Sequence, residues 1–243
     1  MGIYVAAAAA TLLALIAVGL IVRQTTLPRH RLLACAVILA LLPLQPLVFY
    51  AVRLPVLGAL EGASVGNEML FVARFLAAPL TEEPAKWLIL IVAAVRLAVK
   101  SGSAPGLAMA AGLGFGIGEI WFLAEQFSRI PEIQAAPAMQ FWGFVVERAL
   151  VCVLHGLFVV PLFYAVAGRL HIGVAALIGV VLHGMTNAPI LAIHANLFGW
   201  GPAVWGLFAL VWPMVLVAIG IYLLLRHARS EAEVKSESAA AHD

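Results

Sequence analysis

Seven long apolar stretches dominate this chain of 243 residues. A helix needs about 20 consecutive, mostly apolar residues to cross the hydrocarbon of a bilayer. Hydrophobic residues make up 64% of the chain and charged residues only 11%, a composition typical of membrane proteins and foreign to soluble domains. We therefore predict an all-α polytopic membrane protein with about seven transmembrane helices. The predicted spans are 3–22, 32–52, 69–95, 106–127, 142–167, 172–194 and 201–225.

The basic residues predict how these spans are oriented, because lysine and arginine gather in cytoplasmic loops. If the N-terminus lies outside, the outer loops contain only two basic residues, Arg53 and Arg129. The inner loops then contain nine, which are Arg23, Arg29, Arg31, Arg96, Lys100, Arg169, Arg226, Arg229 and Lys235. The bias predicts an N-terminus outside and a C-terminus in the cytoplasm.

The chain reads as one transmembrane domain at residues 1–226, with a catalytic core at about 69–194. The polar segment 227–243 is predicted to be a cytoplasmic tail, either disordered or a frayed helix. No internal repeat is evident, although many transporters are built from two related halves.

The third stretch, 69–95, has a polar centre. Its segment LTEEPAKWLI, Leu80–Ile89, places two adjacent carboxylates and a lysine in an apolar run. A charged residue at the centre of a membrane helix costs about 2.5–3.5 kcal/mol, so these groups should face the bundle interior or a wet cavity. Pro79 and Pro84 bracket the carboxylates, and proline removes a helical hydrogen bond. Two structures stay open: a helix that breaks and restarts with Thr81 as its N-cap, or a continuous kinked helix.

Four ionisable side chains on successive predicted spans fall at one depth. With a rise of about 1.5 Å per residue, Glu82, Glu119, His155 and His183 each lie about 11 to 13 residues from the start of their span. An error of about 2–4 residues in each boundary leaves this agreement intact. We therefore expect the four side chains to meet near the middle of the membrane.

Helical spacing adds neighbours to this group. Residues four apart share a helix face, so Glu82 can pair with Lys86, and His183 can act beside Asn187. Glu83 directly follows the first carboxylate. The fourth span offers a smooth surface for close helix packing, made of Gly112, Gly114, Gly116 and Gly118.

A carboxylate and two neutral imidazoles at one depth suit peptide hydrolysis without a covalent intermediate. A buried glutamate can act as general base on water, one histidine can orient that water, and a histidine with an asparagine amide can stabilise an oxyanion. The less favoured alternative is a zinc site with Glu82, His155 and His183 as ligands. No HExxH motif and no G-x-S-x-G motif is present. We therefore expect a reaction without a cofactor.

The same residues carry a resemblance to a known superfamily. The motifs are EEPAK at Glu82–Lys86, F-x-x-x-E at Phe115–Glu119, ER with a following LH at Glu147–His155, and H-x-x-x-N at His183–Asn187. In this order, on four successive spans, they resemble the glutamic-type intramembrane proteases. That superfamily includes CAAX prenyl-protein endopeptidases, bacteriocin-processing proteins, PrsW-type proteases and a YhfC-like branch. The resemblance covers residues 70–190, half of the chain.

The resemblance implies an intramembrane endopeptidase in the plasma membrane of a bacterium or archaeon. It implies that Glu82 activates water with Glu83 as its supporting neighbour. It also implies that His155 holds the water, while His183 and Asn187 stabilise the oxyanion. The implied partners are the lipid bilayer and a membrane-protein or lipidated peptide substrate. The charge distribution does not point to nucleic acid, and the oligomeric state is not predicted.

Two positions depart from the CAAX pattern and match the PrsW-type pattern instead. Glu119 stands where the CAAX branch has histidine, which leaves its role open, and Lys86 stands where that branch has arginine. The Glu147–Arg148 pair is expected to be structural, near the outer interface. Two other functions remain as alternatives: a proton- or ion-coupled transporter with a Glu–His relay, and a non-catalytic scaffold of the same superfamily.

Overall fold

The structure is a computed structural model that describes residues 1–63, 66–194, 199 and 201–240. Within these ranges every secondary-structure element is a helix, which confirms the all-α prediction. The α-helices are α1 Gly2–Thr25, α2 Arg31–Leu41, α3 Leu44–Val48, α4 Leu54–Gly62, α5 Asn67–Trp87, α6 Ala93–Ala98, α7 Ala104–Ser128, α8 Pro131–Ala135, α9 Trp142–Val166, α10 Ile172–His194 and α11 Pro202–Ala240. The 3-10 and π-helical turns are η1 Pro28–His30, η2 Phe49–Arg53, η3 Leu88–Ile91, η4 Val99–Ser103 and η5 Ala138–Phe141.

Six helical segments among the described residues are long and apolar enough to cross a membrane. They are Gly2–Thr25, Pro28–Gly62, Ala93–Ser128, Ala138–Val166, Ile172–Ile193 and Gly206–Arg226. Each covers most of one predicted span. The remaining predicted span, 69–95, coincides with α5 and η3, and the charged residues of α5 make it the most polar of the seven. A total of seven crossings therefore stays a prediction.

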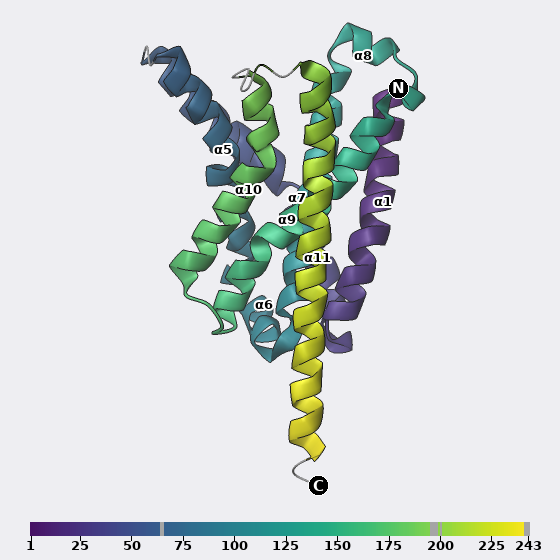
Figure 1. The fold of residues 1–243 in the computed structure, drawn as a ribbon, viewed down its shortest axis with the longest axis vertical. Coiled ribbons are helices and arrows are strands. Elements are labelled where there is room, and N and C mark those ends of the chain that lie inside the picture. The colour runs from purple at the N-terminus through teal and green to yellow at the C-terminus, as the bar shows by residue number, and fades with distance from the viewer. Residues whose placement is uncertain (64–65, 195–198, 200, 241–243) are drawn as a thin grey trace.

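Helix α7 forms the centre of the bundle. In its apolar stretch 78% of the residues are buried, against 11% for the stretch in α11. Helices α1, α2 and α9 pack against α7, and α10 and α11 pack against α9. Large apolar side chains on the outer helices are exposed, as lipid-facing positions require. Figure 1 shows that α1 begins at one end of the long axis and α11 ends at the other.

Glycines on α7 allow the central helices to approach closely. A Cβ at Gly112 would lie 1.9 Å from the backbone nitrogen of Gly156 in α9, and a Cβ at Gly114 would lie 2.3 Å from the carbonyl oxygen of Ile38 in α2. Both distances are far inside van der Waals contact, so only glycine fits. The smooth surface predicted from the sequence thus faces two helices and fixes α9 against α7.

Helix α5 passes through both prolines without a break. Thr81 lies inside the helix and donates its hydroxyl to the carbonyl oxygen of Ala77 at 2.6 Å, so it is not an N-cap. The helix ends at Trp87, where the 3-10 turn Leu88–Ile91 follows. Of the two structures left open by the sequence, the continuous helix is therefore the one adopted.

The polar segment 227–243 was predicted to be either disordered or a frayed helix. Helix α11 continues to Ala240, so the part of segment 227–243 that the structure describes is helical rather than disordered. Residues 241–243 lie outside the described residues.

Candidate active site

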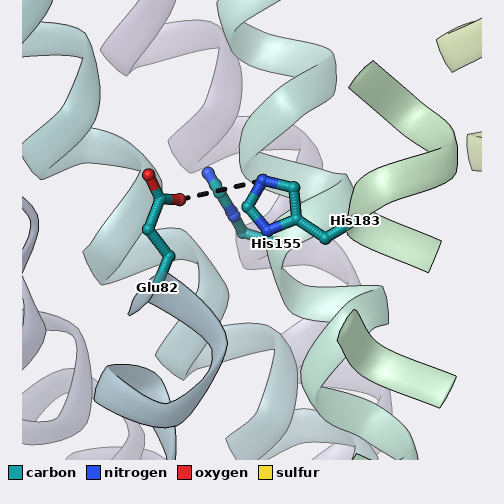
Figure 2. A group of neighbouring side chains, drawn as sticks. All are labelled: Glu82, His155 and His183. Atoms are coloured by element: carbon teal, nitrogen blue, oxygen red, sulfur yellow. Dashed lines mark ion pairs between the residues drawn. The ribbon is translucent and has the colours of Figure 1, made fainter. Parts of the chain in front are cut away.

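A polar cavity of about 200 Å³ lies between α5, α7, α9, α10, α11 and η2. Its polar lining residues are Arg53, Glu82, Glu119, Glu147, Arg148, His155, His183, Thr186 and Asn187. Figure 2 shows Glu82, His155 and His183 projecting toward one another from α5, α9 and α10. The packing of α9 on α7 and of α10 on α5 and α9 brings these side chains together.

Glu82 is almost completely buried, and its two carboxylate oxygens have different surroundings. Oε1 accepts a hydrogen bond from the Arg53 guanidinium in an ion pair. Oε2 is buried and has no hydrogen-bond partner among the described residues. It faces Nε2 of His183 at 3.9 Å, the pair joined by the dashed line in Figure 2. One oxygen is therefore anchored and the other is free at the cavity.

Glu83 and Lys86 form a fully buried ion pair behind the cavity. Nζ of Lys86 lies 2.5 Å from Oε1 of Glu83 and 3.0 Å from Nδ1 of His155. The ammonium also lies over the rings of Phe115 and Phe158, at 5.0 and 5.6 Å from their centroids. A carboxylate and two aromatic faces are the contacts typical of an ammonium group. A charged lysine can only donate, so Nδ1 of His155 is an acceptor.

The neighbours of each imidazole fix where its proton lies. Nδ1 of His183 lies 2.6 Å from Oε1 of Glu83, and an ionised carboxylate can only accept, so Nδ1 carries the proton. With its one proton on Nδ1, an uncharged His183 ring presents a lone pair on Nε2. His155 has the opposite arrangement, because Lys86 occupies its Nδ1. Its Nε2–H donates to Oε2 of Glu119 at 2.9 Å.

Glu119 belongs to an ion-pair chain along one wall of the cavity. Its Oε1 lies 3.1 Å from Nη1 of Arg148, which also forms an ion pair with Glu147. All three side chains line the cavity. The expected Glu147–Arg148 pair is present, and it lines the cavity, where Arg148 also pairs with Glu119.

Five of the six predicted site residues line one cavity, namely Glu82, Glu119, His155, His183 and Asn187. The sixth, Glu83, lies behind them and contacts His183. The predicted pairing of Glu82 with Lys86 is wrong. The lysine bonds Glu83 instead, since a helix offers partners at three and at four residues. Arg53, which the sequence placed in an outer loop, was missed as a site residue. Its only signal was an arginine beside a proline-containing apolar run.

Three side chains at the cavity could supply ligands to a metal ion. Ligand atoms of Glu82, His155 and His183 lie within 4.8 Å of one another. His183 fits, because Glu83 holds its Nδ1–H and leaves Nε2 free to bind. His155 does not fit, because Lys86 donates to its Nδ1 and the proton resides on Nε2. Coordination would require an imidazolate or an uncharged lysine. The hydrogen-bonded arrangement therefore does not suit a three-ligand zinc site.

Comparison of the chain with protein-family models, with curated proteins and with solved structures found no match in any of the three.

Proposed function

We propose that this chain is an intramembrane endopeptidase that hydrolyses a peptide bond of a membrane protein or lipidated peptide with a water activated by Glu82. One observation carries the proposal. A buried carboxylate oxygen without a partner, Oε2 of Glu82, faces the lone pair of His183 at the wall of a polar cavity inside the bundle. We further propose that the protein resides in the plasma membrane of a bacterium or archaeon, with its N-terminus outside.

A water between these two atoms is well placed to become a nucleophile. Oε2 of Glu82 and Nε2 of His183 are both acceptors, and 3.9 Å is a distance that one water spans with two hydrogen bonds. Such a water donates both hydrogens and keeps a lone pair for the substrate carbonyl. Glu82 takes a proton as the new C–O bond forms and the carbonyl π electrons move onto oxygen. It returns that proton to the amine as the C–N bond breaks.

The contacts of the two histidine rings support other roles than those implied by the resemblance. His183 offers an acceptor, so it suits holding the water. His155 is engaged at both nitrogens, by Lys86 and by Glu119, so it suits positioning Glu119 at the cavity wall. The Asn187 amide lines the cavity and suits binding the substrate carbonyl oxygen. Glu83 and Lys86 set both tautomers from behind and do not touch the substrate.

Substrate trapping tests the proposal. Glu82→Gln keeps the shape of the side chain but removes the base, so we expect this variant to retain a bound peptide in native membranes that mass spectrometry can identify. The wild type, reconstituted in liposomes, should cleave that peptide, and Glu82→Gln should not. Glu68→Gln is the matched control, because Glu68 lies exposed on the same helix.

Two results would count against the endopeptidase. Cleavage by folded Glu82→Gln at the wild-type rate would remove Glu82 as the base. Proton-coupled uptake of a solute by wild-type proteoliposomes, lost in Glu82→Gln and without peptide cleavage, would favour the transporter instead.

A further inference from the structure

Arg53 reaches the cavity from an unusual piece of backbone. It is the last residue of the π-helical turn Phe49–Arg53, which joins α3 to α4. Short π-helical segments often occur at functional sites, where they re-aim a side chain. Here the turn directs a guanidinium from the bundle edge to the cavity wall, where it meets Glu82 from α5.

We propose that Arg53 is a catalytic residue of the hydrolysis proposed above, on which this inference rests. Its guanidinium is the counter-ion of Glu82 before the attack and the counter-ion of the tetrahedral oxyanion after it. The side chain is 14% exposed and forms an ion pair with Oε1 of Glu82. Its Nε is buried and has no partner among the described residues. Arg53 lines the cavity, and its guanidinium has one donor without a partner among the described residues.

The aromatic residues around Arg53 hold it in place. The guanidinium carbon lies 5.6 Å from the centroid of the Phe49 ring, which packs against Phe122 at 4.7 Å and against Tyr50 at 5.3 Å. A cation held over an aromatic ring loses little freedom when a new anion approaches, so the donor is preorganised.

The movement of charge in the reaction gives Arg53 its role. Before attack, the negative charge next to Arg53 is on Glu82. When Glu82 accepts the proton of water it becomes neutral, and the same negative charge appears on the former carbonyl oxygen. The half-buried guanidinium then faces a neutral acid and a nearby oxyanion. In a site with little water, its attraction to the oxyanion is strong.

The other cations of the site are less suited to this task. Arg148 is held between two carboxylates, Glu119 and Glu147, whose charge does not change in the reaction. Lys86 lies behind the cavity and is engaged by Glu83 and His155. Among the cations that the structure describes at this cavity, Arg53 is the one paired with the residue that takes up the proton.

Kinetics on the trapped peptide test the inference. We expect Arg53→Gln to lower kcat by about 10²–10³-fold with little change in KM, the loss typical of one oxyanion donor. Arg53→Lys keeps the charge but loses the forked geometry, and it should recover part of kcat. Arg74→Gln is the matched control, because Arg74 is 56% exposed and pairs with Glu61 away from the cavity.

Binding of a phosphinic peptide, with the trapped sequence and a tetrahedral anion at the scissile bond, gives a test that does not depend on turnover. Glu82→Gln frees Arg53 and should bind this analogue at least as tightly as the wild type. The double variant Glu82→Gln/Arg53→Gln should bind the phosphinic peptide about 100-fold more weakly than Glu82→Gln does. Its affinity for the parent peptide should equal that of Glu82→Gln. This variant leaves no unpaired carboxylate at position 82, so it remains informative where Arg53→Gln alone does not fold.

The outcomes separate this inference from the proposed function. If the wild type does not cleave the trapped peptide, the proposed function fails and the role of Arg53 fails with it. If the wild type cleaves but Arg53→Gln keeps kcat, or the double variant binds the phosphinic peptide as tightly as Glu82→Gln does, only the role of Arg53 is overturned.

Discussion

Lys86 determines where the protons of the site lie. It is fully buried, pairs with Glu83 and donates to Nδ1 of His155. Glu83 in turn holds Nδ1–H of His183. One buried ion pair therefore gives the two imidazoles opposite tautomers: His183 has an acceptor toward the cavity, and His155 has a donor that Glu119 accepts.

We expect Lys86→Met to destabilise the protein by about 3–5 kcal/mol, because Glu83 would remain as an unpaired buried charge. Equilibrium unfolding in detergent micelles measures this loss. The double variant Glu83→Gln/Lys86→Met should regain most of it, since no charge is then left alone. Lys100→Met, at an exposed position, should change the stability by less than about 0.5 kcal/mol. A Lys86→Met protein as stable as the wild type would show that the pair contributes no net stability.

At this scale the sequence predicts which residues meet but not how they bond. Counting helical rise brings Glu82, Glu119, His155 and His183 to one depth, and all four line the cavity. The bonds depend on rotation about each helix axis and on rotamers, which a count of residues does not contain. For this reason the sequence assigned the wrong partner to Lys86. Arg53 was missed as a site residue because it follows a predicted span, and a side chain in such a loop was expected to lie at the membrane interface.

At the scale of the helices, the contact between α7 and α9 holds Glu119 and His155 next to each other. Gly112 faces the backbone of Gly156, one residue after His155. Any separation of the two helices at this level would move the His155 ring of α9 away from Glu119 of α7. The glycine surface was predictable from its spacing, whereas the continuity of α5 through Pro79 and Pro84 was not, because packing decides whether such a helix kinks or breaks.

We expect Gly112→Ala to destabilise the protein by about 1–3 kcal/mol, the usual cost of overpacking, since the added methyl group would meet backbone atoms that cannot rotate away. Gly143→Ala is the matched control in α9, where a Cβ meets nothing within 4 Å. There the higher helix propensity of alanine should stabilise the protein by up to about 1 kcal/mol. Thermal unfolding of both variants in the same detergent compares them, and equal stability would mean that α7 and α9 can move apart freely.

For the whole molecule, the ends of the chain bear on the number of crossings. Helix α1 begins at one end of the long axis and α11 ends at the opposite end (Figure 1). An odd number of crossings separates the ends in this way, whereas six crossings would return them to one side. Helix α5, with 21 residues and a length of about 31 Å, is long enough to supply the seventh across a hydrocarbon core of about 30 Å.

Cysteine labelling on the two sides of α5 tests this topology. Gly62, at the end of α4, and Lys100, before α7, are both exposed, and a Cβ at Gly62 meets nothing within 4 Å. In a Cys35→Ser background, we expect a membrane-impermeant maleimide to label Gly62→Cys in intact cells and to label Lys100→Cys only in inverted vesicles. Labelling of both cysteines from one side would mean that α5 does not cross the membrane. The reverse pattern would keep the seven crossings and invert the orientation predicted from the basic residues. The ion pairs of Glu82 and Glu83 make the crossing by α5 tolerable, since they satisfy the charges of Glu82, Glu83 and Lys86 inside the bundle and away from lipid.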